Sequence, residues 1–123
     1  MELIFNDRNY IAYKGDISGI PYFITIFHNN KHRKGQYEVE YSMEGQTSIE
    51  DRAGKDLKHV NTLLLLIEDT LRKVVNTRLY IKSIIYRQDS LRTRYILRYI
   101  TNHNIFSEYK VRSGGEFIII TIR

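Results

Sequence analysis

One stretch of the sequence, residues 57–75, has the periodicity of a long amphipathic helix. Its apolar residues recur in alternating steps of three and four, at Leu57, Val60, Leu64, Ile67, Leu71 and Val74. This spacing places them on one stripe of an α-helix, and such a stripe has to be buried against another element. Because the segments on either side have the residue patterns of β-strands, we expect this helix to supply most of the surface on which a sheet closes its core.

The residues at both ends of this stretch agree with its periodicity. Asp56 is predicted to cap the first turn, where its carboxylate would accept hydrogen bonds from free amide groups. Arg72 and Lys73 fall in the last turns, where cations interact favourably with the helix dipole, and Asn76 is predicted to end the helix.

The first third of the chain has the pattern of a β-meander. Residues 10–14, 22–27 and 36–43 are rich in aromatic and β-branched residues, and turn residues separate them. In the third of these strands Tyr37, Val39 and Tyr41 share one face, while Glu38 and Glu40 share the other. We expect the glutamate face to be open to water.

The second half adds further predicted elements. Residues 79–87 form a strand, residues 91–102 a second helix, and residues 107–112 and 116–122 a final hairpin. Together these patterns predict a single α+β domain over residues 1–123. Its mainly antiparallel sheet packs on the long helix and on the shorter, arginine-rich helix.

Composition narrows the class of protein. The 123 residues include 19 Lys and Arg against 14 Asp and Glu, which gives a net charge of +5 and favours encounters with polyanions. No apolar run approaches the roughly 18 residues that a membrane span requires, and we expect no membrane partner. The first residues lack the features of a secretory signal. The absence of Cys excludes disulfides and thiolate zinc sites.

Two basic segments are candidates for contact with a partner or with nucleic acid. One centres on the predicted second helix, where Arg87, Arg92, Arg94 and Arg98 are interleaved with Tyr86, Tyr95 and Tyr99. Arg94 and Arg98 are four residues apart and share a helix face that can reach phosphates, and neighbouring tyrosines can stack on bases. The other is the loop over residues 28–35, which contains Lys31, Arg33 and Lys34.

Both segments also have an interpretation that involves no ligand. The tyrosines then pack on the sheet, the arginines pair with acids or face water, and the basic loop is simply solvated. Because tyrosine is also common in protein interfaces, the ten tyrosines of the chain do not choose between a protein and a nucleic acid as partner.

No signature of a catalytic, metal or cofactor site is visible in the sequence. His28 and His32 are four residues apart, but Asn29 and Asn30 between them favour a loop over the helix that a metal-binding pair requires. Two adjacent glycines, residues 114–115, precede a strand and predict a hairpin turn, not a phosphate-binding loop. We therefore expect no catalytic residues, no metal, no cofactor and no enzymatic activity.

Residues 89–98 carry a resemblance to a known group of proteins. The segment reads Asp-Ser-Leu-Arg-Thr-Arg-Tyr-Ile-Leu-Arg and begins a helix on an Arg-x-x-Tyr pattern, formed by Arg92 and Tyr95. With its order of strands and helices, the chain resembles small uncharacterised proteins encoded by tailed phages and related bacterial elements. The resemblance implies an origin and assigns no functional residue.

These observations lead to two main hypotheses about function, and an enzyme of unrecognised type ranks third. The first is a non-catalytic structural or assembly component of a tailed phage, found in the virion or the host-cell cytoplasm. It would contact other phage structural proteins, or further copies of itself, through strand edges and tyrosine-rich surface. The alternative is a phage nucleic-acid-binding protein. The residues predicted to contact the partner or the nucleic acid are Lys31, Arg33, Lys34, Arg87, Arg92, Arg94, Arg98 and Tyr99.

Overall fold

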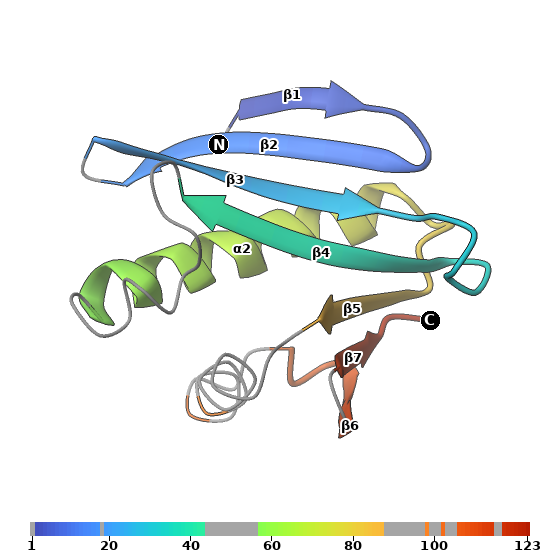
Figure 1. Cartoon of the computed structure of the whole chain (residues 1–123). Coiled ribbons are helices and arrows are strands. Elements are labelled where there is room, and N and C mark those ends of the chain that lie inside the picture. Colours follow the sequence, from blue (N-terminus) through green and yellow to red (C-terminus); the bar gives the residue numbers. More distant parts are fainter. Residues whose placement is uncertain are drawn as a thin grey trace.

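The structure, a computed structural model, describes residues 2–17, 19–43, 57–87, 98, 102, 106–114 and 117–123. The elements within these ranges are β1 (Glu2–Asn6), β2 (Tyr10–Ile17), β3 (Ile20–Phe27), β4 (Gln36–Met43), α2 (Leu57–Thr77), β5 (Ser83–Arg87), β6 (Lys110–Gly114) and β7 (Phe117–Thr121) (Figure 1). Within the same ranges, no helix combines the length and the apolar character needed to cross a bilayer.

All seven strands belong to one mixed sheet, in the order β1-β2-β3-β4-β5-β7-β6. Neighbouring strands are antiparallel except β4 and β5, which run parallel. Parallel neighbours cannot be joined by a hairpin, and here the chain between them includes α2. The helix lies behind the sheet in Figure 1 and covers that face.

The predicted fold, a mainly antiparallel sheet packed on two helices, is therefore wrong. The sheet is mixed, and α2 is the one helix assigned as an element in the described part. The predicted helix over residues 91–102 lies outside the described residues except for Arg98 and Asn102. The parallel pair was missed because residue alternation indicates that a strand exists but not which strand it pairs with.

The individual strands agree with the predictions to different degrees. The strand predicted at residues 36–43 has those bounds, whereas β2 and β3 are longer than predicted and β5 is shorter. The final hairpin is present, but its first strand is shifted to Lys110–Gly114. Strand β1 was not predicted, because none of its residues is buried and its sequence shows no alternation between a buried and an open face.

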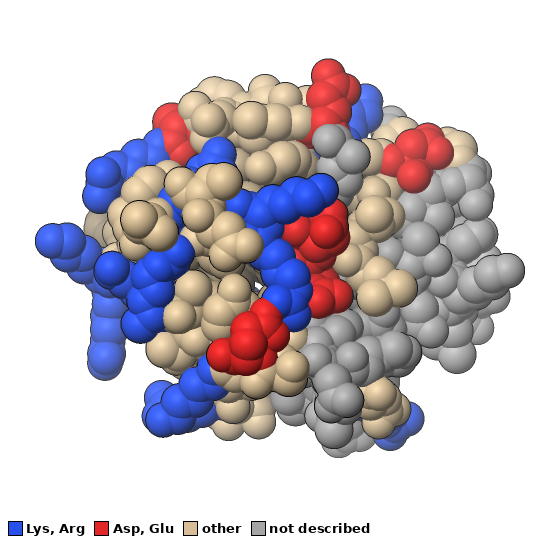
Figure 2. Space-filling model, turned by 180° about the vertical axis from the view of Figure 1, so that it is seen from behind, with Lys and Arg blue, Asp and Glu red and all other residues tan. Residues whose placement is uncertain are grey.

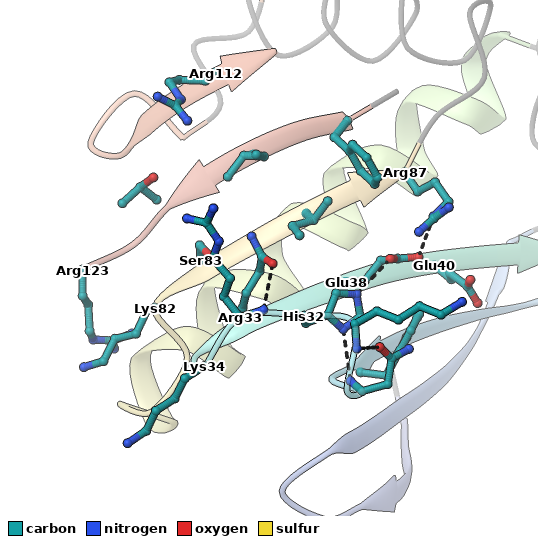
Figure 3. A pocket seen from close by; sticks show the side chains of 18 residues that line it. His32, Arg33, Lys34, Glu38, Glu40, Lys82, Ser83, Arg87, Arg112 and Arg123 are labelled. Carbon is teal, nitrogen blue, oxygen red and sulfur yellow. Dashed lines mark hydrogen bonds and ion pairs between the residues drawn. The ribbon is translucent and has the colours of Figure 1, made fainter. Parts of the chain in front are cut away.

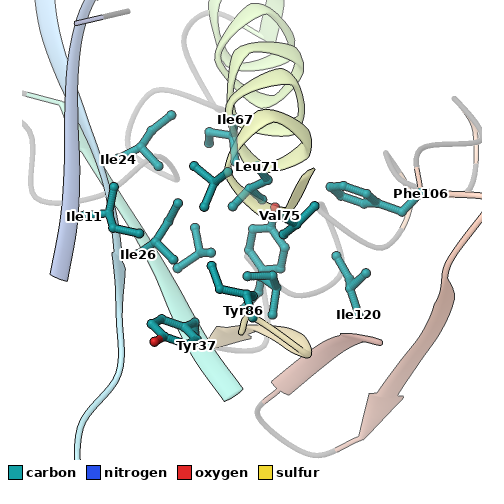
Figure 4. Close-up of a cluster of buried hydrophobic side chains, with 14 of the residues drawn as sticks. Ile11, Ile24, Ile26, Tyr37, Ile67, Leu71, Val75, Tyr86, Phe106 and Ile120 are labelled. Atoms are coloured by element: carbon teal, nitrogen blue, oxygen red, sulfur yellow. The ribbon is translucent and has the colours of Figure 1, made fainter. Parts of the chain in front are cut away.

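The core lies between α2 and one face of the sheet (Figure 4). One row of buried residues crosses five strands as successive pairing partners: Ile11, Ile26, Val39, Tyr86 and Ile118. The helix residues packed against this face are Ile67, Leu71, Val74 and Val75. The predicted stripe is thus confirmed at Ile67, Leu71 and Val74. The side chains of residues 57–64 lie outside the described part.

Helix α2 ends one residue beyond the predicted Asn76, at Thr77. Its cations pair with acids one turn earlier: Arg72 Nε lies 2.7 Å from Glu68 Oε1 and Lys73 Nζ lies 2.9 Å from Asp69 Oδ2. These pairs at a spacing of four residues make weak, solvent-screened contributions to the stability of the helix. The predicted cap, Asp56, lies outside the described residues.

The contribution of the helix to the core can be tested with one substitution at two positions. Leu71 is 1% exposed and Leu65, on the same helix, is 49% exposed. We expect Leu71→Ala to lower the free energy of unfolding by about 2–5 kcal/mol, because it removes buried methyl groups and leaves a cavity. Leu65→Ala should change it by less than about 0.5 kcal/mol. Urea denaturation measures the free energy of unfolding of both variants. Equal losses in the two would show that Leu71 does not pack in the core.

Candidate functional site

The sheet face opposite α2 carries a groove of about 750 Å³, here called the basic groove (Figure 3). One row of side chains, again successive pairing partners, crosses its floor: Phe27, Glu38, Ile85, Ile119 and Arg112. These residues alternate along their strands with the core residues. Because successive residues of a strand point to opposite faces of the sheet, the residues between the core residues form the groove floor.

The loop between β3 and β4 forms one wall of the groove, and its own hydrogen bonds hold its shape. The side chain of Asn29 accepts a hydrogen bond from Lys31 N at 2.9 Å, as in an Asx-turn. In the next turn Gln36 N donates to Arg33 O at 3.0 Å, and Arg33 N donates to Gln36 Oε1 at 3.2 Å. The backbone is thus held in place, while the charged side chains of Lys31, Arg33 and Lys34 are exposed.

Gly35 connects this loop to the start of β5. Its carbonyl accepts hydrogen bonds from Lys82 N at 2.7 Å and from Ser83 N at 3.1 Å. Its φ is +80°, and a Cβ at this position would lie 2.5 Å from Lys82 Cγ. Glycine alone accommodates both the left-handed backbone and this close approach. The wall of the groove is therefore attached to its floor at this point.

Glu38 is buried in the groove floor, although its strand face was predicted to be open to water. Its side chain is 4% exposed, and that of His32, which the loop places over it, is 6% exposed. His32 Nε2 lies 3.1 Å from Glu38 Oε1, and Arg87 Nε lies 3.4 Å from Glu38 Oε2. A buried carboxylate requires such partners, because desolvation penalises its charge. Glu40, on the same face, is exposed as predicted.

Hydrogen bonding determines the tautomer of His32. Asn29 N donates to His32 Nδ1 at 3.0 Å, so Nδ1 carries no proton and Nε2 donates to Glu38. Both ring nitrogens are therefore engaged within the fold. This arrangement positions the loop and Glu38 and does not present a general acid or base to a ligand. In the described ranges, no group of three or more His, Asp or Glu side chains is arranged to hold a metal.

Positive charge dominates the basic groove. Among the described residues, two carboxylates, those of Glu38 and Glu40, line it together with seven cations: Lys31, Arg33, Lys34, Lys82, Arg87, Arg112 and Arg123 (Figure 3). Arg87 pairs with Glu38, and the guanidinium of Arg123 donates to two backbone carbonyls. In the part of the chain that the structure describes, no ion pair engages the other five cations.

Apolar side chains also lie on the floor, between these cations. Phe27, Phe117 and Ile119 are partly exposed there, and the guanidinium carbon of Arg87 lies 5.1 Å from the centre of the Phe117 ring. The groove thus combines exposed positive charge with flat apolar and aromatic surface. This combination suits a ligand that has both negative charge and planar rings.

Four of the eight predicted contact residues come together in the groove: Lys31, Arg33, Lys34 and Arg87. Arg87 does not belong to a helical cluster, because it is the last residue of β5. Arg98 is exposed, and Arg92, Arg94 and Tyr99 lie outside the described residues.

Three groove cations were not identified from the sequence: Lys82, Arg112 and Arg123. Arg112 lies within the predicted final hairpin, and its alternation with Val111 shows that the two residues point to opposite faces. Only the pairing of β6 with β7, of β7 with β5 and of β5 with β4 shows that Arg112 shares a face with Glu38.

Two substitutions at Glu38 separate its role as a hydrogen-bond acceptor from its charge. In Glu38→Ala, the buried Nε2–H of His32 loses its acceptor, and we expect the free energy of unfolding to fall by about 1–3 kcal/mol. Glu38→Gln keeps a side-chain oxygen of similar reach, so its free energy of unfolding should fall clearly less. Urea denaturation measures both variants, and an equal loss in the two would show that the acceptor role is wrong.

Comparisons of the chain with protein-family models, with characterised protein sequences and with solved structures give no match. The function of the basic groove has to follow from its own geometry and charge.

Proposed function

We propose that the chain binds single-stranded nucleic acid in the basic groove. The observation that supports this is the charge of the groove, where seven cations face two carboxylates in the part of the chain that the structure describes. One of these carboxylates, Glu38, is already held by His32 and Arg87. The cations without an ion pair among the described residues are available to phosphates, which attract them whatever the base sequence.

The floor of the groove favours a single strand over a duplex. Unpaired bases stack on aromatic side chains, and Phe27 and Phe117 are partly exposed among the cations. A duplex hides its base faces and is commonly read by a helix or a β-ribbon that enters a groove. The groove floor is instead a broad sheet face.

The width of the sheet suggests the length of strand that fits. The groove extends over five adjacent strands, from β3 to β6. At about 4.8 Å between neighbouring strands this distance is about 19 Å. A stacked single strand advances by about 3.4 Å per nucleotide, so about five or six nucleotides would cross the groove.

Substitutions in the groove test this proposal. We expect Lys31→Ala and Arg112→Ala each to weaken binding of an oligothymidylate several-fold, because each removes a phosphate contact. Each should also reduce the slope of log affinity against log salt by about 0.7–1. Fluorescence anisotropy at several salt concentrations measures both quantities. Lys73→Ala is the matched control, since it removes the same charge from an exposed site on α2.

Two results would contradict the proposal. One is that the wild-type chain shows no salt-sensitive affinity for single strands. The other is that Lys73→Ala weakens binding as much as Lys31→Ala, because the effect would then depend on net charge and not on the groove.

A second candidate function, assembly through protein contacts in a tailed phage, is supported by a different surface. Strand β1 forms one edge of the sheet, and Leu3, Ile4 and Phe5 on it are between 44% and 50% exposed. An apolar edge strand with unpaired backbone groups is a site at which another chain can add a strand.

The β1 edge is tested by placing a charge on it. If the edge pairs with another chain, Ile4→Lys should abolish self-association in sedimentation, or incorporation into particles, because a charged edge opposes strand pairing. Oligonucleotide affinity should not fall in this variant. A wild-type chain that is monomeric and absent from purified particles would contradict the assembly function.

A further inference from the structure

A second pocket, here called the end pocket, adjoins the basic groove. Its volume is about 500 Å³, within the range of pockets that hold small ligands. It lies at the end of the sheet where β4 and β5 begin. The lining residues that matter here are Arg8, His28, Lys34, Tyr37, Tyr80 and Lys82.

The end pocket and the groove are neighbours that share two lining residues. Lys34 and Lys82 line both of them, and the hydrogen bond from Lys82 N to Gly35 O holds the loop against the start of β5 between the two sites. Figure 2 shows Lys and Arg side chains gathered on its left. This side corresponds to the right of Figure 1, where the β1–β2 turn, the β3–β4 loop and the C-terminus lie. A phosphate chain that passes from the groove to the end pocket would therefore meet the same two lysines in both sites.

One wall of the end pocket is a row of aromatic rings. The ring centroids of His28 and Tyr37 are 5.3 Å apart, and those of Tyr37 and Tyr80 are 5.9 Å apart. The hydroxyl of Tyr37 donates to Arg8 O at 2.8 Å. Burial raises the pKa of Tyr37, so this hydroxyl keeps its proton and its hydrogen bond at neutral pH. The backbone of Arg8 is therefore held at the wall.

Tyr80 and Arg8 provide a stacking surface. The guanidinium carbon of Arg8 lies 4.6 Å from the centre of the Tyr80 ring, and Tyr80 is partly exposed, unlike the buried Tyr37. The described lining residues include no Asp or Glu. The carboxylate of the neighbouring Asp7 accepts hydrogen bonds from two backbone amides, those of Asn9 and Tyr10. The pocket thus presents cations and a planar surface side by side.

We propose that the end pocket binds one nucleotide of the strand that lies in the basic groove, with its base against Tyr80 and Arg8 and its phosphate between Lys34 and Lys82. A phosphate alone would use the lysines but not the aromatic wall, whereas a nucleotide uses both. This inference rests on the proposed function of the groove. It extends the binding site around the end of the sheet and favours strands long enough to reach the pocket.

The experiment compares oligothymidylates of about five and about ten nucleotides, lengths that fill the groove alone or extend beyond it. We expect the wild-type chain to bind the longer strand more tightly. Tyr80→Ala should lower the affinity for the longer strand about tenfold, because one stacked base is lost. The affinity for the shorter strand should not change. Tyr80→Phe keeps the ring and should behave as the wild type does.

A second measurement needs no variant. A single 2-aminopurine, whose fluorescence falls when it stacks, is placed at each position of the longer strand in turn. We expect the wild-type chain to quench a position near one end of the longer strand, in addition to the positions that stack on Phe27 and Phe117 in the groove, which the shorter strand also has. If Tyr80→Ala fails to fold, Arg8→Ala provides the comparison, since it removes the other half of the stacking surface.

The outcomes separate the two proposals. If both strands bind with salt-sensitive affinity but no further position is quenched near an end, and Tyr80→Ala does not alter the effect of length, the end pocket is not a nucleotide site and the groove proposal stands. If neither strand binds, both proposals are wrong.

Discussion

The packing of α2 against one face of the sheet is the interaction on which the other surfaces depend. It buries alternate residues of β2, β3, β4, β5 and β7, and the pleat then directs the intervening residues to the opposite face. The segment that contains α2 also connects β4 to β5 in parallel, which places Glu38 beside Ile85. The residues that make up the groove floor therefore depend on the place at which the chain re-enters the sheet after α2.

Glu38 is the residue whose position is hardest to explain by stability alone. A buried carboxylate is stabilising only to the extent that its partners offset its desolvation, and such arrangements often contribute little net stability. Here one oxygen faces a neutral imidazole and the other a largely exposed arginine. We infer that the arrangement serves position more than stability. It ties the tip of the β3–β4 loop to the groove floor and keeps Lys31 and Arg33 at the rim.

Much of the local structure could be predicted from the sequence, because it depends on spacing along the chain. The stripe through Ile67, Leu71 and Val74 and the alternation over Gln36–Met43 are of this kind. The basic loop was predicted for the same reason. The parallel pairing of β4 with β5, the burial of Glu38 and the presence of Arg112 in the groove depend on pairing between distant segments. No periodicity encodes such pairing, so the site could be predicted only in part.

The two candidate functions use different parts of one sheet, a face and an edge, and need not compete. The basic groove extends from β3 to β6, whereas the apolar edge is β1, which β2 separates from β3. A strand added to β1 would extend the sheet away from the groove and leave its cations uncovered. In an assembly built through that edge, the groove of each copy would remain open. Several weak phosphate sites could then act together, and their combined affinity would exceed that of one groove.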